Sequence, residues 1–125
     1  MKVLKFFILF ITLLNILPVS CSDNYNIPEN TVLYDYVSQA FNAYRSKNYP
    51  TAIKNFSKAL NIHKTPDGYL YRGYSYIHTK QYDLAEKDFI TTIALCQYNN
   101  DELCKRYSSF AYDMLNLLEI YKNKL

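Results

Sequence analysis

The chain has 125 residues, the size of a single domain, and 50% of them are hydrophobic, which is enough to form a core. Only two glycines and four prolines are present, which favours helices over a turn-rich β fold. The formal charge of +3 includes Lys2 and Lys5; without them 12 basic residues face 11 acidic ones, and no basic run remains that would predict nucleic-acid binding.

Residues 1–20 are predicted to be a secretory signal. Lys2 and Lys5 give a positive start, and the stretch from Phe6 to Val19 is nearly all apolar. This stretch is shorter than the roughly 20 apolar residues of a membrane-spanning helix, and Pro18 disfavours a continuous helix. We therefore expect a cleaved signal rather than a retained membrane anchor.

Cys21 lies at the end of this signal, and two outcomes are open for it. The sequence LPVSC, which ends in Cys21, resembles the bacterial lipoprotein signal, where a small residue precedes a cysteine that becomes lipidated and N-terminal. Acyl chains on Cys21 would hold the protein to a membrane surface, with the polar residues 21–30 as a tether. Pro18 stands where that signal usually has leucine, so ordinary cleavage nearby, which would release a secreted protein, stays open.

The next segment predicts a helical hairpin. Apolar residues recur at helical spacing from Val32 to Ser46 and again up to His63. Residues 46–49 are expected to form the turn, and Pro50 suits the first turn of the second helix.

Three more helices are predicted after a break at residues 64–68 (KTPDG). The third should run from Gly68 or Tyr69 to Thr79, and the fourth from Tyr82 or Asp83 to Cys96. Asp101 is expected to cap a fifth helix that reaches Asn123. With no strand signal in the sequence, the predicted fold is all-α.

Cys96 and Cys104 flank a polar loop between the last two predicted helices. An exported protein meets an oxidising compartment, and lipidation of Cys21 would leave an even number of cysteines, so we expect a disulfide. The alternative is a pair of buried free thiols at helix contacts.

Two stretches of the chain repeat at a spacing of 33 residues. The matched pairs share size and chemistry: Tyr36/Tyr69, Ala40/Gly73, Lys47/Lys80, Tyr49/Tyr82, Ala52/Ala85, Lys54/Lys87, Phe56/Phe89 and Leu60/Ile93. Small residues and aromatics that agree at one offset are typical of a repeat protein. Because one unit cannot bury its apolar face alone, the units are expected to stack and share a core.

The repeated residues resemble those of the tetratricopeptide family, whose unit is a helix-turn-helix of about 34 residues. The second unit matches best, through Tyr69, Gly73, Tyr76, Tyr82, Ala85 and Phe89. In the first unit Ala43 replaces the family's tyrosine and Lys64 its proline, while the stretch from Tyr107 to Met114 looks like half of a third unit. The resemblance implies a short α-solenoid of about two and a half repeats over residues 31–125, closed by a C-terminal capping helix.

In this family the first helix of each unit lines a concave groove that receives a peptide or a segment of another protein. The corresponding positions here are mostly aromatic: Tyr34, Val37, Phe41, Tyr44, Arg45, Leu70, Tyr74, Ile77, His78 and Tyr112. Surface tyrosines suit protein recognition, although about half of this set is expected to be packing residues. Arg45 and His78 occupy equivalent positions and would give a weak site for a carboxylate.

No pattern for catalysis, metal binding or a cofactor accompanies these positions. His63 and His78 lie in different units without an acidic pair or a nucleophile nearby, and Gly68 and Gly73 do not make a phosphate loop. We therefore expect a non-enzymatic module for protein–protein interaction. The leading expectation is an exported lipoprotein, periplasmic or at the cell envelope, that acts as adaptor or assembly factor at a membrane surface. The alternative is a soluble secreted effector or modulator that uses the same groove.

Overall fold

The computed structural model describes residues 29–124, and this part of the chain contains five helices and no strand. The helices are α2 (Glu29–Arg45), α3 (Tyr49–Ile62), α4 (Pro66–His78), α5 (Tyr82–Cys96) and α6 (Glu102–Asn123). The prediction of an all-α fold is confirmed for these residues. None of these helices has the length and apolar character needed to cross a membrane. The predicted signal, Cys21 and nearly all of the tether lie outside the described residues.

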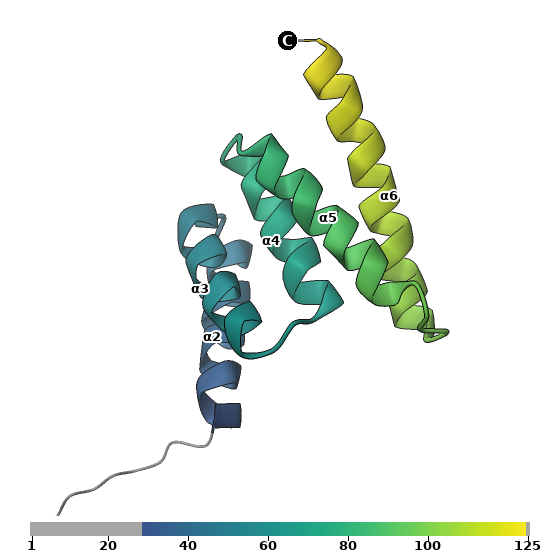
Figure 1. The fold of residues 1–125 in the computed structure, drawn as a ribbon. Coiled ribbons are helices and arrows are strands. Elements are labelled where there is room, and N and C mark those ends of the chain that lie inside the picture. The colour runs from purple at the N-terminus through teal and green to yellow at the C-terminus, as the bar shows by residue number, and fades with distance from the viewer. Residues whose placement is uncertain (1–28, 125) are drawn as a thin grey trace, which may run out of the picture.

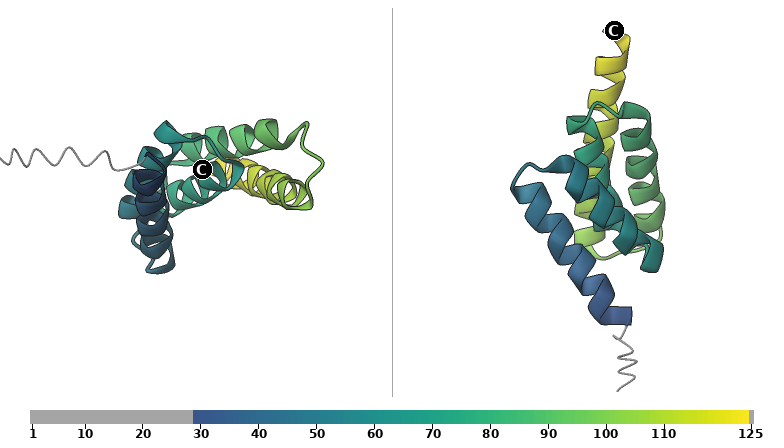
Figure 2. Two further views of the ribbon diagram at one scale, coloured as in Figure 1. Left: turned by 90° about the horizontal axis from the view of Figure 1, so that it is seen from below. Right: turned by 90° about the vertical axis from the view of Figure 1, so that its left-hand side faces the viewer.

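Each helix packs against the next one along the chain, and successive helices run in opposite directions (Figure 1). Helices two apart, α2 with α4 and α4 with α6, also touch, though more sparingly. The C-terminal end of α6 extends past the turn between α4 and α5 (Figures 1 and 2). The arrangement therefore places α4 in the middle, in contact with all four other helices.

The turns of the two hairpins, α2–α3 and α4–α5, have the same backbone geometry 33 residues apart. Lys47 and Lys80 both lie in the left-handed region, with φ of 59° and 60°. The N–H of Lys47 donates to the carbonyl of Tyr44, and the N–H of Lys80 donates in the same way to Ile77. Because positive φ is uncommon for residues other than glycine, this match means that the sequence repeat is also a repeat of backbone structure.

The starts of α2 and α4 both differ from the predicted boundaries. α2 begins at Glu29 rather than at Val32, so Glu29 and Asn30 belong to the helix and not to the predicted tether. α4 begins at Pro66 rather than at Gly68 or Tyr69, so residues 66–68 form its first turn instead of a break. The Thr65 side chain accepts a hydrogen bond from the Gly68 N–H at 3.2 Å, and Pro66 lacks the N–H that a first helical position would leave unpaired. Pro50 takes the predicted place in the first turn of α3.

Two hydrophobic clusters hold the helices together. Ala40, Ala52 and Phe56 form the first one, between α2 and α3. The second lies between α4, α5 and α6 and consists of Leu70, Ala85, Phe89, Ala111, Met114 and Leu118. Tyr71 of α4 packs against the first cluster, so α4 connects the two.

A partly buried ion pair lies within the α4–α5 hairpin, and its arginine also bonds to the α2–α3 hairpin. Arg72 of α4 donates to both carboxylate oxygens of Asp88 in α5, at 2.8 and 2.7 Å, and to the hydroxyl oxygen of Ser57 in α3 at 3.1 Å. Burial acts to lower the pKa of Arg72, but its hydrogen bond and charge interaction with Asp88 outweigh that effect and raise the pKa. The guanidinium therefore stays charged and fixes how α3, α4 and α5 meet.

Helix α6 is attached to α5 near both of its ends. Cys96 and Cys104 are both buried and form a disulfide with a Cα–Cα distance of 5.3 Å. Toward the other end, Lys122 donates to Asp83 at 2.8 Å and also to Glu86, in an exposed ion-pair cluster. Asp101 stands at the N-cap of α6 as predicted, but its side chain makes no capping hydrogen bond.

Candidate functional site

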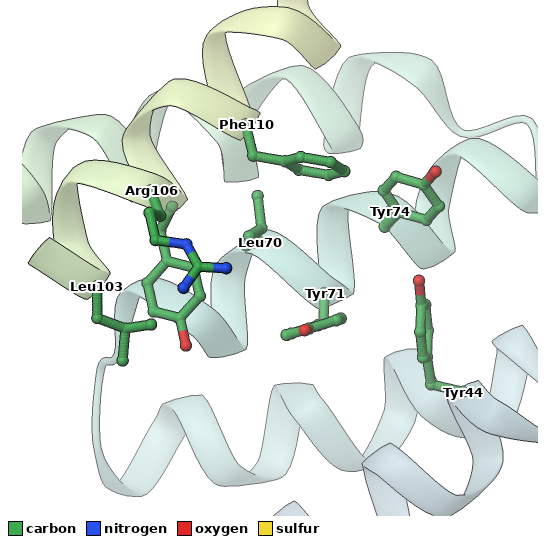
Figure 3. A pocket seen from close by; sticks show the side chains of 8 residues that line it. Tyr44, Leu70, Tyr71, Tyr74, Leu103, Arg106 and Phe110 are labelled. Carbon is green, nitrogen blue, oxygen red and sulfur yellow. The ribbon is translucent and has the colours of Figure 1, made fainter.

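A cavity of about 580 Å³ opens between α2, α4 and α6 (Figure 3). We call it the aromatic cavity, and its lining residues are Tyr44, Leu70, Tyr71, Tyr74, Leu103, Arg106, Tyr107 and Phe110. Its volume lies within the range of about 300–1,000 Å³ that is usual for ligand sites. The lining combines large apolar surface with a few polar groups, as binding sites do.

Helical periodicity explains which side chains reach this cavity. On α4, Leu70, Tyr71 and Tyr74 are one, three or four residues apart, so they project from one face of the helix. On α6, Leu103, Arg106 and Phe110 are spaced by three and four residues and share a face in the same way.

Ring-to-ring contacts connect the walls of the aromatic cavity to the core. Tyr44 packs edge-on against Tyr71 and Tyr74, with ring centroids 5.2 and 6.2 Å apart. Tyr74 in turn stacks on Phe110 of α6 at 5.9 Å. Tyr71 also lies edge-on against Phe41 at 4.9 Å. Because such pairs favour particular geometries, these contacts orient the rings of the aromatic walls relative to one another.

The polar groups of the aromatic cavity are hydrogen-bond donors. Burial, with the neighbouring tyrosines, raises the pKa of Tyr44 to about 12. Burial, followed by the charge of Asp67 and the nearby Tyr71, also raises the pKa of Tyr107. Both phenols therefore stay protonated at neutral pH and can donate. Arg106 supplies the charge: its guanidinium points into the cavity (Figure 3), and no acidic residue lines the cavity.

A second cavity, of about 210 Å³, continues along the same two helices. Its lining residues are Tyr74, Ile77, His78, Met114, Leu117, Leu118 and Tyr121. Tyr74 lines both cavities, so we treat them together as the α4–α6 groove. The His78 ring stacks on Tyr49 of α3, with centroids 4.1 Å apart and planes 4° from parallel, which fixes one wall of the second cavity.

The predicted groove residues separate into three sets in the structure. Those that line the α4–α6 groove are Tyr44, Leu70, Tyr74, Ile77 and His78. Val37 and Phe41 instead line a small cavity of about 100 Å³ between α2, α3 and the start of α4. Phe41 packs edge-on against the buried Phe56 at 5.2 Å, so it acts as a packing residue.

The remaining three predicted residues, Tyr34, Arg45 and Tyr112, are exposed and line none of the cavities described here. Tyr112 follows Phe110 by two positions, which turns it by about 200° around the α6 axis, away from the groove. Arg45 lines neither part of the groove, and the carboxylate site of Arg45 and His78 stays a prediction.

Sequence reasoning missed most of what α6 contributes. Leu103, Arg106, Tyr107 and Phe110 line the aromatic cavity, whereas the sequence was interpreted with α6 mainly as a cap. Their signal was present in the chain: Leu103, Phe110 and Leu117 follow each other at intervals of seven residues, which places them on one line along a helix. Leu103, Phe110 and Leu117 lie outside the core clusters and are exposed. Apolar side chains that the core does not use indicate a contact surface.

Comparison with known proteins found no matching protein-family model, no matching curated protein and no matching solved structure. Among residues 29–124, no group of three or more His, Cys, Asp and Glu side chains is placed to hold a metal ion. The groove is therefore interpreted from its own side chains.

Proposed function

We propose that this protein is a non-enzymatic binding module, a short tetratricopeptide-like solenoid that holds a segment of another protein in the α4–α6 groove. The observation that carries this proposal is the aromatic cavity, to which α2, α4 and α6 all contribute side chains. These are the first helices of the proposed units, and in the tetratricopeptide family such helices line the peptide groove. The matching turns at Lys47 and Lys80 support the same assignment.

The chemistry of the lining favours binding over turnover. Tyrosine and arginine are, with tryptophan, the residues most enriched at interface hot spots, because they combine large contact area with directed hydrogen bonds. The aromatic cavity has four tyrosines and Arg106 beside leucine and phenylalanine. A phenol with a raised pKa, such as Tyr44, is a poor general base at neutral pH and a stable donor.

Binding in the groove is tested by two aromatic substitutions on the same helix. Phe110→Ala removes a half-exposed ring from the wall of the groove, whereas Tyr112→Ala removes an exposed ring from another face of α6. Peptides selected from a random display library against the protein should bind Phe110→Ala at least about ten-fold more weakly, the loss typical of a central hot-spot residue. Tyr112→Ala should bind them normally, and both variants should keep the circular dichroism of the parent. Equal binding by Phe110→Ala would refute the groove as the site.

The proposal also includes export, with residues 1–20 as a signal and Cys21 as the lipidated first residue of an adaptor or assembly factor at a membrane surface. The intact mass of the mature protein from its native cells distinguishes the two outcomes that the sequence leaves open. A mass that includes diacylglycerol on Cys21 supports the membrane-bound form. An unmodified start near Cys21 would identify the soluble secreted form and exclude the lipid anchor.

A further inference from the structure

Helix α6 presents a line of apolar side chains that its own fold leaves uncovered. Leu103, Phe110 and Leu117 are 48%, 44% and 45% exposed, and Tyr121, one turn further on, is 57% exposed. We call these four residues the α6 stripe. All four line the α4–α6 groove, Leu103 and Phe110 in the aromatic cavity and the other two in the second cavity. From Leu103 to Tyr121 the stripe extends about 27 Å, or five helical turns.

The spacing of the stripe fits a helical occupant. Seven residues are close to two turns, so Leu103, Phe110 and Leu117 form one seam along α6. A second helix laid along this seam can place apolar residues of its own, three or four positions apart, between them. An extended segment has a repeat of two residues and would match the seam only by chance.

Backbone hydrogen bonding also favours a helical occupant over an extended one. An extended segment brings N–H and C=O groups that the groove would have to satisfy, and an unpaired group excluded from water is costly. The second cavity offers little for this purpose, since most of its lining is aliphatic or methionine and no asparagine or glutamine contributes. A helix satisfies its own backbone and needs only apolar contact from such a wall.

Charge complementarity defines the other requirement for the occupant. Arg106 is the charged residue of the aromatic cavity, no acidic residue lines either part of the groove, and the ion pairs among residues 29–124 do not include Arg106. Two acidic residues lie near the groove without lining it: Asp113, which is exposed and follows Phe110 by one turn, and Asp67, whose charge raises the pKa of Tyr107. A carboxylate on the occupant would therefore meet a guanidinium and phenol donors at the Leu103 end of the groove.

We propose that the α4–α6 groove holds an amphipathic helix of a partner protein, with its apolar face on the α6 stripe and an aspartate or glutamate against Arg106. The inference rests on the proposed function and narrows it, because it names the conformation and the charge of the bound segment. The bound helix would be about 18 residues long, which matches the length of the stripe.

The probe is a set of peptides about 20 residues long, selected from a random display library on the purified full chain and then synthesised. We expect them to carry apolar residues at helical spacing together with an acidic residue, and to become helical by circular dichroism on binding. Arg106→Glu should weaken their binding roughly ten-fold or more. Lys105→Glu makes the same change of charge on the neighbouring exposed residue, which lines neither cavity, and should bind normally. Changing the peptide's acidic residue to lysine should restore binding to the Arg106→Glu variant.

The outcomes separate this inference from the proposed function. Selected peptides that stay extended when bound, yet lose affinity for Phe110→Ala, would overturn the helical occupant and leave groove binding intact. Equal losses for Arg106→Glu and Lys105→Glu would overturn the role of Arg106. If no peptide is enriched, or if those enriched bind Phe110→Ala normally, both proposals fail. Arg106→Gln, which removes the charge without reversing it, should fold like the parent and give a smaller loss.

Discussion

Small residues determine how closely neighbouring helices approach in this protein. Ala40, Ala52, Ala85 and Ala111 are fully buried where helices cross, and Gly73 is buried as well. Ala40 and Gly73 are equivalent in the repeat, yet only the first carries a methyl group. The difference matters because a Cβ on Gly73 would lie 2.9 Å from Cε1 of Phe89 and 3.1 Å from Cβ of Asp88.

Gly73→Ala should therefore destabilise the protein, although glycine in a helix normally costs up to about 1 kcal/mol relative to alanine. Phe89 is fully buried and Asp88 is held by Arg72, so neither neighbour can move easily. Overpacking costs of about 1–3 kcal/mol outweigh the gain in helix propensity, and we expect a net loss of about 1–2 kcal/mol in urea unfolding. Ser109→Ala, at an exposed site in α6, is the control and should not destabilise. A Gly73→Ala variant as stable as the parent would show that the helices can separate at this point.

Ionisation of Tyr44 should lower the stability of the folded protein at alkaline pH. Its pKa rises from an ordinary 10.0 to about 12 in the folded protein, mainly through burial. Because the folded state prefers the protonated phenol, this group reduces stability as the pH rises from about 10 to about 12 and has no such effect below about 10. Thermal melts across this range should show a smaller alkaline loss for Tyr44→Phe than for the parent. Tyr34→Phe removes an exposed phenol from the same helix as the control, and a similar benefit from it would contradict the assignment to Tyr44.

At the scale of helices, local signals were easier to predict than orientation. Pro50 marks the start of α3, and the small residues Ala40 and Gly73 mark places where helices cross closely. These signals can be predicted from sequence because each depends on one residue and its nearest neighbours. Pro66 was misjudged for a related reason. A proline interrupts a helix when it lies in the interior but suits the first position of a helix. The hydrogen bond from the Gly68 N–H to the Thr65 side chain identifies Pro66 as the start of α4.

The part of the groove formed by α6 could not be predicted in the same way. Which face of α6 turns toward α4 depends on how the helix is rotated about its axis. The Cys96–Cys104 disulfide, which spans eight positions, and the contacts of Lys122 with Asp83 and Glu86, 39 and 36 positions away, hold α6 against α5. The rotation therefore depends on contacts that the spacing within α6 does not show. The spacing of seven residues places Phe110 on the same face as Leu103, but it does not show that this face lines a cavity with Tyr44.

Breaking the Cys96–Cys104 disulfide should loosen the start of α6 and lower stability. The bond spans eight positions, so it restricts a small loop and should contribute about 2–3 kcal/mol. A reducing agent should lower the unfolding midpoint of the parent. The Cys96→Ala/Cys104→Ala variant should already have a low midpoint and should not respond to the reducing agent. A parent whose fully reduced form melts unchanged would show that the packing of α6 does not depend on the bond.

On the scale of the whole molecule, the five helices within residues 29–124 form a row whose middle is better supported than its ends. α4 contacts every other helix, and Arg72 ties it to α3 and α5. α2 relies mainly on α3, and α6 relies mainly on α5. In such a row the stability of each helix depends on its neighbours, so the ends should open before the centre.

Hydrogen exchange of the native protein should therefore be graded along the chain. We expect the slowest amides in α4 and α5, faster exchange in α3, and the fastest in the first turns of α2 and the last turns of α6, where the helix extends past the α4–α5 turn.

The Cys96→Ala/Cys104→Ala variant should lose protection in the first turns of α6 and keep it in α3, because the disulfide acts only on α6 and its neighbour. Equal rates in all five helices would mean that the protein opens as one unit. In that case the groove would form and disappear with the whole fold, whereas graded exchange would allow α6 to adjust to a bound segment while α4 stays in place.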